Sequence, residues 1–451
     1  MPADIVIKNA SLVIPNNQII EADIAITRGR VVSWSRTIDS AASIEINAAG
    51  KTVIPGVIDP HTHLGVFGSL EDEASSETQA AISGGVTTLG CYVSGEDSYL
   101  EEVPEWIRTV ESYLFTDVFL HPVILTDYQL NELHHYVDRL AIRSFKVYMW
   151  GLPGVIDSVD DGFLLDVFKA AAECPEPPRV CIHAENPQLI RRATDKLGAQ
   201  VYSREGTLAD WEKTHPGISE SEAVARAMFL ARETGVPLYF VHTSSRQTVD
   251  VLQSSISSNV SVETTSPYLS LDVTSPCGVL GKMVPPLRQR EDVEQLWEAI
   301  GNELISTIGT DNTTLTRAEK KADESIWKAI PGYPVLATHL PVIIEEGYHH
   351  RKIPLPKLIG LVTENVARLF GIYPKKGTLL PGSDADLVIL DLELERIVHA
   401  QGLPSRSDFS LYEGQTLRGW PTTVIKSGRV IYDNGKIETS LRGIGSSLHI
   451  R

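Results

Sequence analysis

Cysteine is scarce in this chain of 451 residues, which contains four. The four are far apart in the sequence and no two form a Cys-x-x-Cys pair; they are Cys91, Cys174, Cys181 and Cys277. Disulfide frameworks and thiolate zinc sites both require closely patterned cysteines. The sequence therefore favours neither kind of site, and we expect free, buried thiols.

The chain also lacks a basic tract and any apolar run long enough to cross a bilayer. Its first residues, Met1-Pro2-Ala3-Asp4, do not show the basic and then apolar pattern of a signal peptide. The formal net charge of -18 would repel a polyanion such as nucleic acid. We therefore expect a cytoplasmic protein with a small-molecule substrate, and neither a nucleic-acid nor a membrane partner.

Both ends of the chain contain short strands that alternate apolar and polar residues and have no helical period. Examples are residues 4–7, 22–26, 385–391 and 423–432. Strands at the two termini can pair with each other. We predict that residues 1–54 and 376–451 together form one small β-sandwich domain.

The middle of the chain, residues 55–375, alternates short apolar strands with helical stretches. The helical stretches include residues 103–114, 164–172, 221–234 and 291–304. This alternation indicates a parallel sheet, and the number of repeats favours a closed barrel. With 42% hydrophobic residues, the chain can bury a core of that size. The predicted fold class is α/β: a (β/α)8 TIM-like barrel with the small β-sandwich domain attached.

Two histidines, His61 and His63, follow the apolar run Val53–Ile58. Side chains at positions i and i+2 of a strand point to the same face, so the two imidazoles can bind one metal ion. The simpler interpretation is two polar residues in a loop. A β-branched strand that ends in histidines is, however, typical of the C-terminal mouth of an α/β barrel, where the active site lies.

Other metal-binding side chains follow later apolar runs in the same way. His183 ends the run at 179–183, His242 follows 238–241, and Asp311 follows 304–310. Between them, Lys146 in Phe145-Lys146-Val147 would point at the same mouth. A protonated lysine is a poor ligand, but its neutral amine can react with carbon dioxide to give a carbamate that bridges two metal ions. A structural ion pair or a catalytic amine explains Lys146 equally well.

The chain resembles the binuclear amidohydrolase superfamily, in particular its cyclic-amide branch of hydantoinases (dihydropyrimidinases), allantoinases and dihydroorotases. The match covers nearly the whole chain and includes Met283–Arg288 and Gly382–Val388. It rests on six positions in the family's order: His61, His63, Lys146, His183, His242 and Asp311.

The resemblance implies two divalent metal ions bridged by a carbon dioxide-derived carbamate on Lys146. One ion would be held by His61, His63 and Asp311, and the other by His183 and His242. Zinc is the expected metal, although these ligands also suit manganese, cobalt or iron. Metal-bridged hydroxide would attack an amide carbonyl, and Asp311 would pass the proton to the leaving nitrogen. The predicted reaction is opening of the C–N bond of a cyclic amide, ureide or imide, as in hydantoinases.

Several positions differ from those relatives and bear on the substrate. Gly65 stands where dihydroorotases have an arginine that binds the substrate carboxylate, which argues against that activity. Gly151 stands where hydantoinases have a tyrosine five residues after the lysine, so Tyr148, Trp150, a loop residue or the second metal would take over its role. Val284 and Asn312 also depart from the hydantoinase pattern.

We therefore expect substrate contacts from Tyr148, Trp150, Val284 and Asn312. The side chains of Trp150, Leu152 and Val284 would make the pocket apolar. An apolar pocket would favour a ring with an aromatic or alkyl substituent. Core packing explains Trp150 equally well.

Three alternative functions remain open from the sequence. The first is an allantoinase-like activity, and the second is another amidase, lactamase or carboxylesterase on the same site. The third is a catalytically silent scaffold, which is disfavoured because all six ligands are present. By resemblance, the chain is expected to form a homotetramer or a dimer, with contacts near Tyr412–Gly414 and Leu417–Gly419.

The remaining histidines and one glutamate receive simpler predictions. We expect Glu185 to be either a partner of His183 or an ordinary loop carboxylate, and His121 to lie in the core. The other histidines are expected at the surface: His134, His135, His215, His339, His349, His350, His399 and His449.

Overall fold

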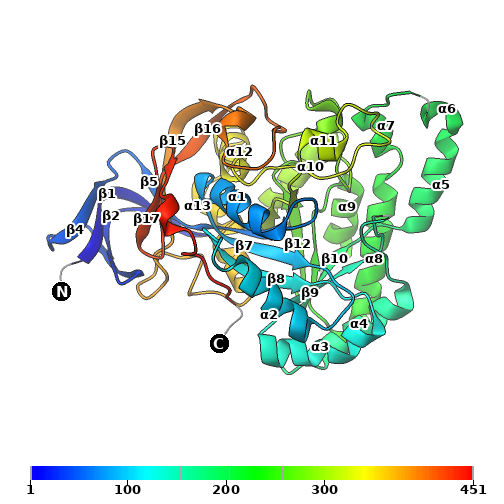
Figure 1. The fold of residues 1–451 in the computed structure, drawn as a ribbon, viewed down its shortest axis with the longest axis horizontal. Coiled ribbons are helices and arrows are strands. Elements are labelled where there is room, and N and C mark those ends of the chain that lie inside the picture. The colour runs from blue at the N-terminus through cyan, green and yellow to red at the C-terminus, as the bar shows by residue number, and fades with distance from the viewer. Residues whose placement is uncertain (1–2, 153, 203, 256, 449–451) are drawn as a thin grey trace.

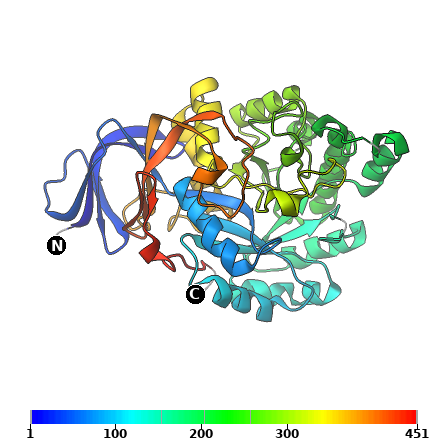
Figure 2. The same ribbon diagram turned by 45° about the horizontal axis from the view of Figure 1, so that its top comes forward.

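The computed structural model describes residues 3–448 except residues 153, 203 and 256. Figure 1 shows a mainly antiparallel sheet at one end of the molecule and a larger body of parallel strands and helices at the other. In the turned view of Figure 2, helices surround the parallel strands. Within the described part of the chain, no helix combines the length and apolarity that a bilayer crossing requires.

Eight parallel strands in chain order form the larger body, as far as the chain is described. They are β6 (Val57–His63), β7 (Val86–Val93), β8 (Asp117–Pro122), β9 (Ser144–Tyr148), β10 (Arg179–His183), β11 (Leu238–Phe240), β12 (Val260–Thr265) and β13 (Thr307–Gly309). The short strand β14 (Asn312–Thr313) follows β13 and pairs with β6, and a bridge between Val123 and Lys146 joins the end of β8 to β9. The strands therefore follow one another around a barrel, which confirms the predicted fold class.

The sequences of the barrel strands suit burial on both faces. All eight residues of β7, Val-Thr-Thr-Leu-Gly-Cys-Tyr-Val, are buried, as expected for parallel strands covered by helices. The covering helices are α1 (Leu70–Ser83), α2 (Tyr99–Val110), α3 (Asp127–Leu140), α4 (Asp161–Ala172), α8 (Gly217–Thr234), α9 (Arg246–Ser255), α10 (Arg290–Gly301), α13 (Leu355–Leu361) and α14 (Glu364–Leu369). Side-chain caps begin several of them, such as Ser98 for α2 and Asp160 for α4.

The predicted helices agree with the observed ones to within a few residues, and the largest difference is at α2, which begins at Tyr99 and ends at Val110. Further helices and helical turns lie in the segments that connect or follow these elements. They are α5 (Pro187–Leu197), α6 (Ala199–Tyr202), α7 (Leu208–Glu212), α11 (Arg317–Lys320), α12 (His339–Ile343) with a π-helical turn at Ile344–His350, and 3-10 turns at Gly278–Gly281, Ala400–Gly402 and Thr439–Leu441.

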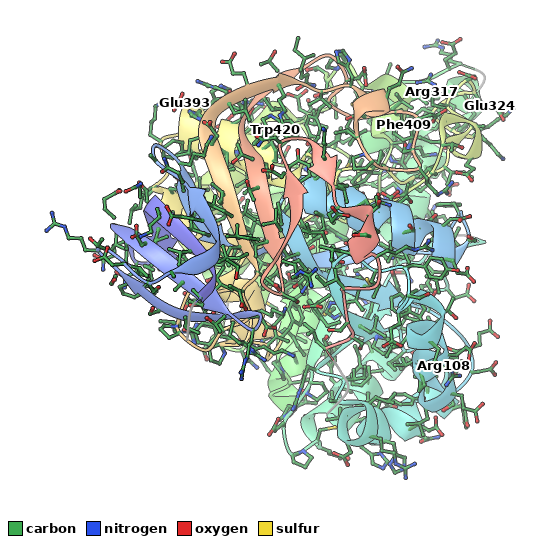
Figure 3. All side chains as sticks on the ribbon, turned by 60° about the vertical axis from the view of Figure 1, so that its left-hand side comes forward. Arg108, Arg317, Glu324, Glu393, Phe409 and Trp420 are labelled. Carbon is green, nitrogen blue, oxygen red and sulfur yellow. The ribbon has the colours of Figure 1, made fainter. Side chains whose placement is uncertain are left out.

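The smaller body is one hydrogen-bonded sheet of nine strands within the described residues. The first half supplies β1 (Ala3–Ile14), β2 (Gln18–Thr27), β3 (Arg30–Ser35), β4 (Ala42–Asn47) and β5 (Thr52–Pro55), and the second half supplies β15 (Leu387–Ile397), β16 (Thr416–Lys426), β17 (Arg429–Asp433) and β18 (Lys436–Ile437). Strands β5 and β15 pair antiparallel and so join the two ends of the chain. Figure 3 turns this sheet toward the viewer, with Glu393 on β15 and Trp420 on β16.

The core of the sheet combines side chains from both chain ends, such as Ile7, Val53, Leu387 and Ile389. Apolar side chains from distant segments thus share one core, as the sequence pattern predicted. The exact division at residues 54/55 and 375/376 stays a prediction.

A buried cluster of charges lies where the sheet meets the barrel. Lys426 Nζ is 2.7 Å from Asp117 Oδ2 at the start of β8 and 3.2 Å from Asp386 Oδ2. Lys376 also pairs with Asp117 and Asp386, and with Asp384. Burial raises the pKa of Asp117, but the two ammonium groups outweigh it and hold that pKa well below its ordinary value. The three carboxylates resemble a cation site, but the two lysines neutralise them together with Arg30, which lies 2.7 Å from Asp384 Oδ1.

The four cysteines are free, as predicted; Cys91, Cys174 and Cys181 are buried, and Cys277 is half-buried.

Candidate metal centre

The structure brings the six predicted ligands together at one end of the barrel. Lys146 lies within β9, and the other five lie at or near the carboxyl ends of β6, β10, β11 and β13, where barrel active sites form. All six line one cavity of about 590 Å³: His61, His63, Lys146, His183, His242 and Asp311.

His61, His63 and Asp311 form the first group. Asp311 Oδ1 is 3.1 Å from His61 Nε2 and 3.2 Å from His63 Nε2. One donor atom from each residue lies within 4.8 Å of the other two, a spacing suited to one shared cation. Asp311 has a φ of 55°, in the left-handed region that a non-glycine residue seldom occupies. In this conformation, the Asp311 carboxylate faces the two imidazoles.

His183 and His242 form the second group. His183 Nδ1 lies 2.9 Å from His242 Nε2, so the two ring nitrogens converge on one point. His242 has a φ of 40° and is strained in the same way as Asp311. Both rings are almost fully buried.

Lys146 lies on β9 between the two groups and is fully buried. Its Nζ has no hydrogen-bond partner among the described residues and lies 4.7 Å from the centre of the Tyr92 ring and 4.8 Å from that of Tyr148. No ion pair of Lys146 occurs in the described structure, which removes the structural ion pair as its explanation. Burial lowers the pKa of this amine to about 8.

The donor set fits two divalent cations. Besides Lys146 Nζ, the Nε2 atom of His61 is buried without a hydrogen bond of acceptable geometry within the described structure, although Asp311 is close. A buried polar atom without a partner is costly unless something else binds it. Neutral imidazoles and a carboxylate are the ligands that zinc, manganese, cobalt and iron accept in proteins.

Glu263 supports both groups and was missed by the sequence analysis. Its Oε1 accepts hydrogen bonds from His61 Nδ1 at 2.8 Å and from the backbone N–H of His242 at 3.0 Å. The Tyr239 hydroxyl donates to Oε2 at 2.7 Å. This carboxylate leaves His61 Nε2 free to face the cavity. The signal in the sequence was a single charge within the β-branched strand Val260–Thr265.

Asp59 connects β6 to β13 beneath the site. It accepts hydrogen bonds from the backbone N–H of Thr310 at 3.0 Å and from the Thr62 hydroxyl at 2.7 Å. Burial raises the pKa of Asp59 to about 6. The contacts fix the turn that carries Asp311.

Apolar and aromatic side chains form part of the cavity wall, beside the polar candidate ligands. Tyr148, Trp150, Leu152 and Val284 line the cavity, together with Trp106 from α2. The Tyr148 ring lies 5.6 Å from the His183 ring. Trp150 lies beyond the end of β9, so it reaches the cavity from a loop.

The structure does not bring Asn312 to the described cavity wall. Its side chain is fully buried and donates to Thr314 Oγ1 at 2.9 Å, and its carbonyl oxygen accepts from the Val335 N–H at 2.8 Å. Both ends of the amide are therefore used to hold neighbouring loops together.

Gly151 has no room for a side chain. A Cβ atom there would lie 2.2 Å from the carbonyl oxygen of Ile156 and 2.6 Å from the carbonyl carbon of Asp157. The tyrosine that hydantoinases carry at this position is therefore excluded by the path of the following loop.

Several predictions for histidines are corrected by the structure. His215, His339 and His349 are buried, not exposed. His339 Nδ1 contacts Ser266 Oγ at 3.0 Å, and His349 Nε2 donates to the Leu392 carbonyl at 2.8 Å. Neighbouring elements cover these rings, which the polar local sequence did not reveal.

Other histidine predictions agree with the structure. His121 lies in the core, with Nε2 3.1 Å from the Pro60 carbonyl. His134, His350 and His399 are exposed and His135 is half-buried, whereas His449 lies outside the described residues. Glu185 is fully buried, with Oε2 3.0 Å from His183 Nε2, so of its two predicted roles the partner of His183 is observed.

Comparison with known proteins agrees with this geometry. The chain is 32% identical over 453 residues to the L-hydantoinase of Paenarthrobacter aurescens, covering 96% of this chain and 95% of that one. It is 33% identical over 441 residues to the D-hydantoinase of Geobacillus stearothermophilus, covering 94% and 92%. The solved structure of the L-hydantoinase (dihydropyrimidinase) from Arthrobacter aurescens superposes with a TM-score of 0.92 at 31% identity, over 99% of this chain and 100% of that one. Residues 52–431 match the model of the amidohydrolase family, and the chain belongs to this family, in the branch that contains the cyclic amidohydrolases.

Proposed function

We propose that this protein is a metal-dependent hydrolase that opens the C–N bond of a cyclic amide, ureide or imide. The observation that carries the proposal is the convergence of five metal-binding side chains and one unpartnered buried lysine on a single cavity. Relatives over nearly the whole chain are named hydantoinases, which supports the same reaction class.

Two divalent cations, with zinc the expected metal, would be bound by this chain. His61, His63 and Asp311 would hold one ion, and His183 and His242 the other. A carbamate on Lys146, formed from its amine and carbon dioxide, would contribute oxygen ligands to the metal centre. When bound, such ions acidify a water molecule and polarise the amide carbonyl.

Asp311 would move the proton. Its Oδ2 points away from the two imidazoles and can accept a proton from the attacking water. The water oxygen bonds to the carbonyl carbon, the C–N bond breaks, and Asp311 returns the proton to the departing nitrogen. The products are the opened nitrogen end of the former ring, which keeps the returned proton, and a carboxylic acid, which becomes a carboxylate by releasing the second proton of the water to solvent. An amide nitrogen is a poor leaving group, so its protonation is essential.

The cavity walls would select a neutral ring with an apolar substituent. Trp106, Trp150, Leu152 and Val284 give an apolar surface, and the described lining includes no arginine to pair with a substrate carboxylate. Gly65, at the position of the dihydroorotase arginine, also lies in this lining. A carboxylated ring such as dihydroorotate is therefore disfavoured.

A hydrolysis screen tests the proposal. Protein prepared with zinc and bicarbonate would be assayed against substituted hydantoins, dihydrouracil, allantoin, cyclic imides, lactams and carboxylic esters. We expect ring opening of at least one cyclic amide, ureide or imide, and about two metal ions per chain. Asp311→Asn is expected to fold and to lose turnover. A protein that binds no metal and opens no ring would contradict the proposal and support a silent scaffold.

The assembly and the location are also proposals. By analogy with the family, the chain would form a homotetramer or a dimer in the cytoplasm, and sedimentation of the purified protein would measure its assembly state.

A further inference from the structure

Glu185 and His215 form a buried chain of contacts behind His183. Glu185 Oε2 lies 3.0 Å from His183 Nε2, and Glu185 Oε1 lies 3.0 Å from His215 Nδ1. Both residues are buried: the exposed fraction is 0% for Glu185 and 1% for His215. The two residues come from different parts of the chain: Glu185 lies two residues after the end of β10, and His215 lies in the segment between α7 and α8.

The surroundings of His215 fix its ring. The ring of Trp150 meets it edge-on, with centroids 4.8 Å apart and planes at 89°, and the ring of Trp211 lies 5.0 Å away. The buried Arg288 donates a hydrogen bond to the carbonyl oxygen of His215. A ring enclosed in this way has little freedom to turn, so its Nδ1 stays directed at Glu185.

The chemistry of the contacts determines the state of His183. An ionised carboxylate only accepts hydrogen bonds, so both His183 Nε2 and His215 Nδ1 must carry the hydrogen that they share with Glu185. A neutral His183 with its hydrogen on Nε2 has its lone pair on Nδ1. That atom is the one that faces His242 Nε2 at 2.9 Å.

We propose that Glu185 and His215 are a positioning pair that keeps His183 in the one tautomer and orientation in which Nδ1 can bind a metal ion. The proposal rests on the metal-binding role of His183 in the proposed function. The pair also joins this ligand to the cavity wall, because Trp150 lines the cavity and packs on His215.

Glu185→Gln tests the pair with almost no change in shape. A glutamine side chain presents one acceptor and one donor, so it cannot accept from both rings. Either His183 loses its contact or its hydrogen moves to Nδ1, which removes the lone pair from the metal site. Zinc alone would be titrated into the metal-free protein against a competing chelator, without any substrate. We expect the second zinc ion to bind roughly 10–100-fold more weakly.

Glu77→Gln is the matched control. Glu77 is also a fully buried carboxylate, but its partners include Ser76, Ser405 and the N–H of Arg406, none of which lines the cavity. This variant is expected to bind two zinc ions as the wild type does. Wild-type zinc affinity in Glu185→Gln, or an equal loss in both variants, would overturn the proposal.

Two substitutions of His215 keep the test decisive if Glu185→Gln does not fold. His215→Gln retains an N–H for Glu185 and should bind zinc within a few-fold of the wild type, whereas His215→Phe should bind the second ion roughly tenfold more weakly. Equal affinities in the two variants would refute the pair. Because the readout is zinc binding, a failed hydrolysis screen would count against the proposed function alone.

Discussion

The hydroxyl group of Tyr333 shares its hydrogen between Asp311 Oδ2, at 3.4 Å, and the carbonyl oxygen of Thr310, at 3.2 Å. Asp311 thus has two different environments, with Oδ1 facing the imidazoles and Oδ2 facing a phenol. Burial and the Asp311 charge raise the pKa of Tyr333 well above its ordinary value, so the hydroxyl keeps its proton. The loop is fixed by Lys320, whose Nζ donates to the Gly332 carbonyl at 2.7 Å.

Tyr333→Phe is expected to lower kcat with a smaller change in KM, because the phenol orients the carboxylate that moves the proton. Loss of one hydrogen bond to a charged group predicts a roughly tenfold decrease in kcat. Steady-state kinetics on the best substrate of the screen would measure it. Tyr136→Phe is the control, since the Tyr136 hydroxyl contacts Glu132 at 2.9 Å on α3, outside the cavity. Equal kcat in the two variants would show that Tyr333 has no such role.

The buried charge cluster between the sheet and the barrel is expected to stabilise the folded protein. Lys426→Met leaves Asp117 and Asp386 short of one buried partner. Breaking a buried pair in this way is expected to lower the free energy of unfolding by about 3–5 kcal/mol near pH 7. Chemical denaturation would measure the change. Lys169→Met is the control, because its pair with Asp166 is exposed and should change stability by less than about 1 kcal/mol.

The same cluster makes the free energy of unfolding depend on pH. The folded-state pKa values of Asp117 and Asp386 lie below the ordinary value, so their stabilisation is complete above about pH 5 and is lost as the pH falls through the folded-state pKa values. The difference in stability between wild type and Lys426→Met should therefore shrink in acid. A difference that stays constant from pH 7 to pH 3 would contradict this account.

The sequence predicted the ligands because each follows an apolar strand, and parallel strands of a barrel end at the same face. It did not predict His215, which lies in the polar segment Lys213-Thr214-His215-Pro216 and is buried by Trp150 and Trp211. It also missed Tyr333, whose loop reaches Asp311 through contacts with residues 310–313. Contacts between loops depend on tertiary packing, which leaves no periodic pattern in the chain.

Gly151→Ala tests the path of the loop that excludes a tyrosine. The added Cβ would meet backbone atoms of Ile156 and Asp157, which cannot move without shifting the loop. We expect a loss of about 1–3 kcal/mol in unfolding free energy and a higher KM, because Leu152 on this loop lines the cavity. Gly301→Ala is the control, since nothing lies within 4 Å of its added Cβ. Unchanged stability and KM in Gly151→Ala would show that the loop adapts.

Trp150→Ala separates the two roles of this side chain. The indole lines the cavity, where an apolar substituent would pack, and it also contacts His215 behind the metal site. A disturbed metal site lowers turnover of every substrate alike, whereas a lost wall contact affects only rings that carry a large substituent. The informative quantity is therefore the ratio of kcat/KM for an aryl-substituted ring to that for an unsubstituted one. If Trp150 packs on the substituent, Trp150→Ala should lower this ratio roughly tenfold. If both rings lose activity equally, Trp150 supports His215 and does not bind the substituent.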